Sequence, residues 1–215
     1  MNNTSTKKRT PDRLAFVQFS VLLAIEIIFC FTPLGTLPAL GPLSATLSHV
    51  PVIVTAIIMG PWWGSAMGFA FGACSFIYWT FVAPGAFSFI YTPFVSVDGG
   101  KGNPASLLIC FVPRILIGLV AGLLFSRLRK TKLSDHGSAV IAGLLGTLTN
   151  TFLVLGGIWI FFASEYMALV GTGKAIYSIL GLTVLTNGLP EAVIGAGVAS
   201  LVAVPVLKAV NKHYR

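Results

Sequence analysis

The stretch LLICFVPRILIGLVAGLLF, residues 107–125, decides how the rest of the chain is interpreted. A helix needs about 20 mainly apolar residues to cross a bilayer, and this stretch is long and apolar enough to do so. Arg114 nevertheless lies inside it, and a charge at that depth costs at least about 2.5–3.5 kcal/mol even on the mildest insertion scale. Pro113 precedes the arginine and has no backbone N–H, which frees a carbonyl one turn earlier. Because an arginine inside a membrane span marks a functional site by default, Arg114 is the first candidate binding residue.

The composition is that of an integral membrane protein. The chain has 215 residues, of which 55% are hydrophobic and only 9% are charged, whereas soluble domains carry about 25% charged residues. The net charge of +8 comes from basic residues at the ends of apolar runs, a distribution that does not indicate nucleic-acid binding. The three cysteines are odd in number and lack C-x-x-C spacing, so neither a disulfide framework nor a metal site is expected. We also expect no cofactor.

The apolar runs predict an all-α membrane protein, a bundle of six transmembrane helices. The expected helices cover residues 14–31, 45–59, 64–82, 107–125 and 138–162, with a last helix that begins after residue 174 and ends near residue 210. The basic flank and apolar run of residues 7–31 could be a signal peptide, but no small-x-small cleavage pattern follows, so a retained first helix is expected.

The connections between these helices differ in length. Long connections follow the first and third helices, at residues 32–44 and 83–104. Residues 60–64 (GPWWG) predict a tight turn with interfacial tryptophans, and residues 164–174 predict a short outer loop.

The basic residues predict the orientation in the membrane. Lysine and arginine gather in the N-terminal tail, in residues 127–132 and near the C-terminus, whereas the remaining connections hold only Lys101 and Lys174. The positive-inside rule then places both termini in the cytoplasm and the two long connections outside. The expected organisation is a cytoplasmic tail at residues 1–13, one membrane domain at residues 14–210, and a cytoplasmic tail at residues 211–215.

Several other polar residues interrupt the apolar spans. Bare polar groups cost several kcal/mol in hydrocarbon, so they are expected to face the interior of the bundle. Aromatic residues at the end of the third helix and in the connection that follows it can close such a pocket. We therefore expect a substrate pocket on the outer half of the bundle, lined by Arg114, Asn150, Asn187, Glu191, Tyr91 and Trp79.

The residues alone leave two roles open for Arg114. It can form an internal ion pair with Glu191 or Glu26, since buried charges are usually paired. It can instead bind a substrate carboxylate, because the guanidinium fork makes two parallel hydrogen bonds to that group. In a combined arrangement Glu191 orients Arg114 and the substrate completes the shell. Asn150 and Asn187 can likewise bind substrate or link helices to one another.

A small-xxx-small pair, Ser20 and Ala24, marks one face of the first helix. This face can pack inside the bundle or dock to a separate subunit. No catalytic constellation is recognisable, and GGKGN at residues 99–103 lacks the spacing of a phosphate loop. A binding subunit therefore accounts for the pocket better than an autonomous facilitator or an intramembrane enzyme does.

Four segments carry a resemblance to a known family: PVIVTAIIMGPWWGSAMGFAFG at 51–72, PRILIGLVAGLLF at 113–125, GTLTNT at 146–151 and NGLPE at 187–191. With them, nearly the whole chain resembles the substrate-binding S component of an energy-coupling factor (ECF) vitamin transporter. The resemblance implies a multi-pass protein of the bacterial cell membrane. It also implies partners: a transmembrane T component and two cytoplasmic ATPases of an ABC-type module.

The same segments are most similar to the branch that includes pantothenate and folate carriers. Pantothenate is the expected substrate, with folate, hydroxymethylpyrimidine and riboflavin as alternatives. The family docks to its T component through an Ala-xxx-Ala motif on the first helix. Here Ser20 replaces the first alanine and Ala24 supplies the second, so the resemblance implies that this pair docks the partner.

Overall fold

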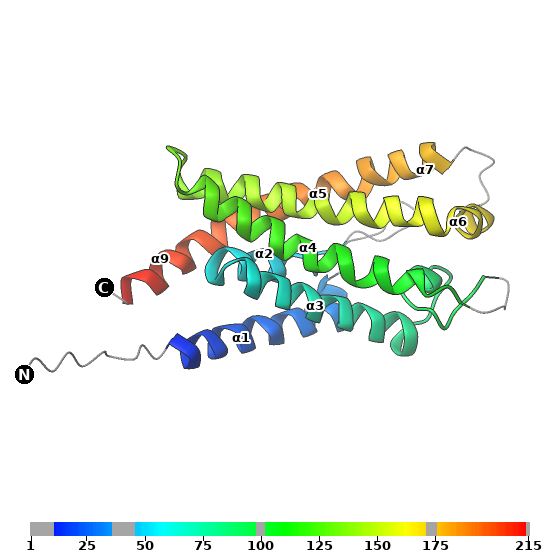
Figure 1. Cartoon of the computed structure of the whole chain (residues 1–215), viewed down its shortest axis with the longest axis horizontal. Helices are drawn as coiled ribbons and strands as arrows, with labels where there is room; N and C mark the ends of the chain where they lie inside the picture. The colour runs from blue at the N-terminus through cyan, green and yellow to red at the C-terminus, as the bar shows by residue number, and fades with distance from the viewer. Residues whose placement is uncertain (1–10, 36–45, 98–101, 171–175, 214–215) are drawn as a thin grey trace, which may run out of the picture.

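The computed structural model describes residues 11–35, 46–97, 102–170 and 176–213, and all regular secondary structure in these ranges is helical (Figure 1). The long single helices are α1 (Pro11–Phe31), α3 (Pro61–Ile77), α4 (Ala105–Leu128) and α5 (Asp135–Phe161). The shorter elements before residue 171 are η1 (Pro33–Gly35), α2 (Val50–Met59), η2 (Tyr78–Val82), η3 (Ser88–Ile90) and α6 (Ala163–Val170). A final run of consecutive helical pieces comprises α7 (Ile176–Thr183), η4 (Val184–Gly188), α8 (Leu189–Val198), η5 (Ala199–Ala203) and α9 (Val204–His213).

Five helical stretches in the described part of the chain are long and apolar enough to cross a membrane. They are Arg13–Phe31, Pro61–Val82, Ala105–Leu128, Asp135–Phe161 and Ile176–Val210. The remaining apolar helix, α2, has 10 residues and at about 1.5 Å per residue covers only half of a hydrocarbon core about 30 Å thick. Most of α2 is buried inside the bundle. The all-helical membrane architecture is confirmed. The structure differs from the expected six full spans because α2 is too short to cross the membrane.

Close packing of α3 on α4 fixes the centre of the bundle. A Cβ atom added to Gly68 would lie only 2.1 Å from the carbonyl oxygen of Arg114. One turn away, Gly64 of α3 and Gly118 of α4 face each other just as closely. Membrane helices associate largely through such van der Waals packing of small residues. This contact is what holds the backbone of Arg114 in place.

Two of the expected connections are helical instead. The tight turn at residues 60–64 is confined to Gly60, whose φ of 100° glycine tolerates readily, and Pro61 then opens α3 at a position where a missing N–H has no cost. The expected outer loop at residues 164–174 begins as α6, and the part from residue 171 onward lies outside the described residues. Tyr166 of α6 is fully buried against Phe87, with ring centroids 5.7 Å apart, and this contact anchors the short helix.

Gly188 and Pro190 do not interrupt the last helical run, which continues from α7 to α9. The π-helical turn η4 ends at Gly188, two residues before Pro190. A π turn accommodates the missing N–H and the bulk of the proline ring without ending the helix. α2 begins at Val50, five residues later than expected. Pro51 lies in its first turn, where the missing N–H of a proline is tolerated.

Candidate functional site

A cavity of about 480 Å³ lies between α1, α3, α4, α5 and the η4–α8 segment. Its volume is in the range of small-molecule sites, about 300–1,000 Å³. Every residue that the sequence indicated for a pocket lines this cavity: Arg114, Asn150, Asn187, Glu191, Tyr91 and Trp79. These residues come from five separate elements and from the connection between α3 and α4, so the fold gathers them from much of the chain.

Arg114 is held in place by the backbone defect that precedes it. Pro113 has no N–H to donate to the carbonyl of Ile109, four residues earlier in α4. Nη1 of Arg114 donates a hydrogen bond to that carbonyl instead, at 2.7 Å. The proline and the arginine therefore form one local unit, in which the freed acceptor fixes the direction of the guanidinium group.

Two aromatic rings enclose the same guanidinium group. Its central carbon lies 4.9 Å from the ring centroid of Tyr91 and 5.4 Å from that of Phe71, both within cation–π range. Arg114 is only 5% exposed, and its Nε atom is buried with no hydrogen-bond partner in the described part of the chain. Burial raises the pKa of Tyr91, which keeps its phenol neutral, while the nearby charge of Arg114 opposes the rise. The cation is thus oriented but only partly satisfied by the protein.

The ion pair considered for Arg114 is not formed. Among the described residues the one salt bridge joins Arg129 to Asp135, at 2.9 Å. Glu191 lines the cavity, but its Oε1 accepts a hydrogen bond from the backbone N–H of Thr46, which ties the segment before α2 to α8. The guanidinium group therefore lacks a carboxylate within ion-pair distance in the part of the chain that the structure describes.

Glu26, the other proposed partner, is not one of the residues that line the cavity. It is fully buried in α1, and its Oε1 accepts a hydrogen bond from the Cys30 thiol at 3.2 Å. Sequence reasoning could not exclude this residue, because an acidic residue inside a span carries no mark of the helix face on which it lies.

Aromatic and amide groups form the rest of the wall. The rings of Trp79 and Tyr91 are stacked, with centroids 5.6 Å apart and planes 26° from parallel. Oδ1 of Asn150 is buried with no hydrogen-bond partner among the described residues. The Thr183 hydroxyl is occupied by the Ile179 carbonyl at 3.0 Å. The cavity thus combines a cation and amide groups with flat aromatic surface, which suits a small, polar, anionic molecule.

Sequence reasoning missed part of the lining. Phe71 of α3 and the end of α1 also border the cavity, as do Thr46 and Ser48 from the segment that precedes α2. Apolar residues at these positions cannot be told from lipid-facing ones by composition, and the short polar ones resemble an ordinary connection.

Comparison with known proteins assigns this architecture to a family. The family model for the substrate-specific component of ECF transporters matches residues 15–207. The chain belongs to that family. This S component is 31% identical over 206 residues to the pantothenic acid transporter PanT of Lactococcus lactis subsp. cremoris strain MG1363, covering 95% of this chain and 98% of the relative. It also shares its fold, with a TM-score of 0.55 over 93% of each chain and 16% identity, with the biotin S component of an ECF-type ABC transporter.

The family implies a vitamin substrate and an assembly with a T component and ATPases. In this S component the small-residue pair of α1 faces away from the bundle. Ser20 and Ala24 are both exposed, beside Val17 and Val21, which are 55% and 57% exposed. The Ser20 hydroxyl donates to the Phe16 carbonyl at 2.8 Å, so it is satisfied by its own helix. The pair therefore does not pack inside the bundle formed by the described residues.

Proposed function

We propose that this S component captures pantothenate from outside the cell for ATP-driven uptake. The observation that carries the proposal is Arg114, a buried and oriented cation with no carboxylate partner among the described residues, beside a cavity of about 480 Å³. A buried charge that is not paired by the protein favours a ligand of opposite charge. Pantothenate is anionic, and the pantothenic acid transporter of L. lactis matches nearly the full length of the chain.

The chemistry of pantothenate fits the distribution of groups around the cavity. Its carboxylate would bind the guanidinium of Arg114, for which a planar fork is the best match. Its hydroxyl and amide groups would bind Asn150, Asn187 and Glu191, which supply both donors and acceptors. The stacked rings of Trp79 and Tyr91 offer an apolar surface for its dimethyl group. In this arrangement the site binds the carboxylate in one place and the hydroxyl groups in another.

The orientation follows from the distribution of charge. The start of α1 and the end of α9 lie at the same end of the bundle as the α4–α5 turn (Figure 1). That turn contains Arg129 and Lys130, and the positive-inside rule assigns it to the cytoplasm. The cavity then opens toward the outer side. We propose residues 14–210 as the membrane domain, with α2 as its sixth and partial crossing, and residues 1–13 and 211–215 as cytoplasmic tails.

The exposed face of α1 would dock the T component. Ser20 and Ala24 permit close approach of a second helix, because small side chains let backbones come together in a membrane. Two cytoplasmic ATPases would complete the assembly and drive release of the vitamin. Assembly and vitamin binding then use different parts of α1, since the end of α1 lines the cavity and Ser20 lies about three turns earlier.

The proposal is tested by calorimetric titration of the purified, ligand-stripped protein with pantothenate, folate, riboflavin and hydroxymethylpyrimidine. Tight, stoichiometric binding of pantothenate alone is expected. Binding of another vitamin in its place would reassign the substrate, and binding of none would leave Arg114 without a role as a ligand-binding residue. Pantothenate flux into liposomes without ATP or partners would instead favour an autonomous facilitator.

A further inference from the structure

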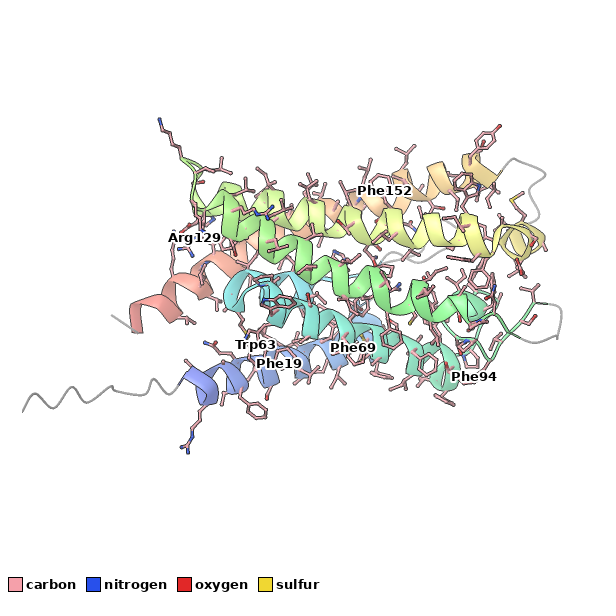
Figure 2. All side chains as sticks on the ribbon, viewed as in Figure 1. Phe19, Trp63, Phe69, Phe94, Arg129 and Phe152 are labelled. Atoms are coloured by element: carbon pink, nitrogen blue, oxygen red, sulfur yellow. The ribbon has the colours of Figure 1, made fainter. Side chains whose placement is uncertain are left out.

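A second cavity, a groove on the surface of the bundle, lies between α5 and α7 and is called the α5–α7 groove. Its volume is about 300 Å³, and its lining includes Phe152, Gly156 and Trp159 of α5 together with Tyr177 and Gly181 of α7. Figure 2 shows Phe152 in the region where these two helices run near each other. The groove is distinct from the vitamin cavity, with which it shares a single lining residue, Leu155.

The groove exists because two features coincide. α5 packs extensively on α8 but makes little contact with α7, so the two helices diverge. At the point of divergence both helices carry a glycine, and a Cβ atom added to Gly156 or Gly181 would meet no atom within 4 Å. Larger residues at either position would fill the space. These glycines therefore leave room open, unlike Gly68, whose missing side chain lets two helices touch.

The environment of the groove excludes polar occupants. Both flanking helices belong to stretches that can span a membrane, so hydrocarbon surrounds the opening. Apart from the Tyr177 hydroxyl and the Trp159 indole N–H, the lining side chains are apolar, whereas a water molecule needs two to four polar partners to be held. The apolar lining, in a region that can span the membrane, matches the chemistry of a single flexible hydrocarbon chain.

We propose that the α5–α7 groove binds one acyl chain of a membrane phospholipid. Phe152, Trp159 and Tyr177 are 61%, 61% and 76% exposed, and their rings border the groove and give the chain flat apolar contacts. Leu155 is only 7% exposed and separates the chain from the vitamin cavity. The bound chain thus supports the outer side of a wall whose inner side faces the vitamin. This site does not depend on which vitamin the cavity accepts.

Tryptophan quenching in detergent tests the proposal, because Trp159 lines the groove. In a full-length variant with Trp62→Phe, Trp63→Phe and Trp79→Phe, the emission of Trp159 is followed as phosphatidylcholine with brominated chains is added. We expect quenching that saturates at about one lipid per protein. A matched variant that retains only Trp62, which is 80% exposed on α3, should show quenching that rises gradually with the lipid content of the micelle.

Filling the groove supplies the second arm of the test. Gly156→Leu combined with Gly181→Leu should reduce the quenching of Trp159 at the one-to-one ratio at least fivefold. The control Gly197→Leu should leave it unchanged, since Gly197 on α8 also faces open space but does not line the groove. Each variant is first shown to elute as a single species in size-exclusion chromatography.

Two results would overturn the proposal. Quenching of Trp159 that does not saturate, or that is identical in the filled variant, would mean that only the general lipid surroundings touch this surface. Trp159 that stays shielded from the quencher at every ratio, in a protein that runs as a dimer, would mean that a second copy of the chain covers the groove.

Discussion

Gly68→Ala is the substitution whose consequence can be worked out most completely from the structure. The new methyl carbon would lie 2.1 Å from the carbonyl oxygen of Arg114 and 2.7 Å from its carbonyl carbon, whereas ordinary contacts begin at 3.4 Å. Both obstructing atoms belong to the backbone, so no side-chain rotation relieves the clash. α3 and α4 must therefore separate by more than about 1 Å, which displaces Arg114 from its place beside Tyr91 and Phe71.

The magnitude follows from two opposing terms. Overpacking a close contact costs about 1–3 kcal/mol, and this case belongs near the upper end because the backbone cannot move aside. Replacing glycine by alanine in a helix returns about 0.5–1 kcal/mol. The net loss is about 2 kcal/mol, which for a chain of this size corresponds to a decrease in Tm of about 4–8 °C. Affinity for pantothenate should fall as well, because Arg114 moves.

The assay is thermal unfolding of the purified protein in detergent, paired with vitamin titration. Gly197→Ala is the matched control, since a methyl group there meets no atom within 4 Å and only the helical preference of alanine remains. The control should melt at or slightly above the temperature of the unmodified protein. If Gly68→Ala melts within about 1 °C of Gly197→Ala and binds the vitamin equally well, the account of how α3 positions Arg114 is refuted.

Substitutions at three further positions separate binding from structure. Arg114→Met should change the stability of the ligand-free protein by no more than about 1–2 kcal/mol, because removing a buried charge that has no carboxylate partner among the described residues offsets the lost hydrogen bond to Ile109. A loss of about 3–5 kcal/mol by thermal unfolding would restore the ion-pair hypothesis. Glu191→Gln should keep the hydrogen bond from the Thr46 N–H and therefore the unfolding temperature. Glu191→Ala should lower the stability by about 1–3 kcal/mol, because that N–H loses its acceptor. Equal unfolding temperatures for the two variants would contradict a structural role for this hydrogen bond. Ser20→Leu should leave the vitamin affinity measured by calorimetry unchanged but reduce the amount of T component and ATPases that co-purifies. Weaker vitamin binding with unchanged co-purification would contradict docking through α1.

The position of the cavity could be predicted because polar residues are costly in hydrocarbon. Arg114, Asn187 and Glu191 stand out from apolar surroundings, and each of them lines the cavity. Their contact with a vitamin remains a prediction. The Pro113–Arg114 pair was also informative, since a missing N–H frees the carbonyl that the arginine binds. These predictions rest on the free-energy cost of a polar group in hydrocarbon or of a missing N–H in a helix. Both costs can be recognised from the sequence without knowing the fold.

Other features depend on contacts that a sequence does not encode locally. Phe71 contributes one of the two rings at the guanidinium group, yet its letter is indistinguishable from that of a lipid-facing phenylalanine. The sequence predicts a loop where α6 forms, because the stability of α6 comes from the burial of Tyr166 against a distant segment. The pairing of Arg114 with an acidic residue was a reasonable hypothesis from charge alone, but the carboxylate of Glu191 is directed to Thr46.

The central claim is that Arg114 binds the carboxylate of pantothenate, and a thermodynamic cycle tests it most directly. Pantothenate and panthenol, in which a primary alcohol replaces the carboxylate, are titrated calorimetrically into the unmodified protein and into Arg114→Met. The unmodified protein should prefer pantothenate by about 2–5 kcal/mol, roughly 30-fold to several thousand-fold, and Arg114→Met should lose that preference. An equal preference for pantothenate in both proteins would contradict the claim and place the carboxylate elsewhere in the cavity.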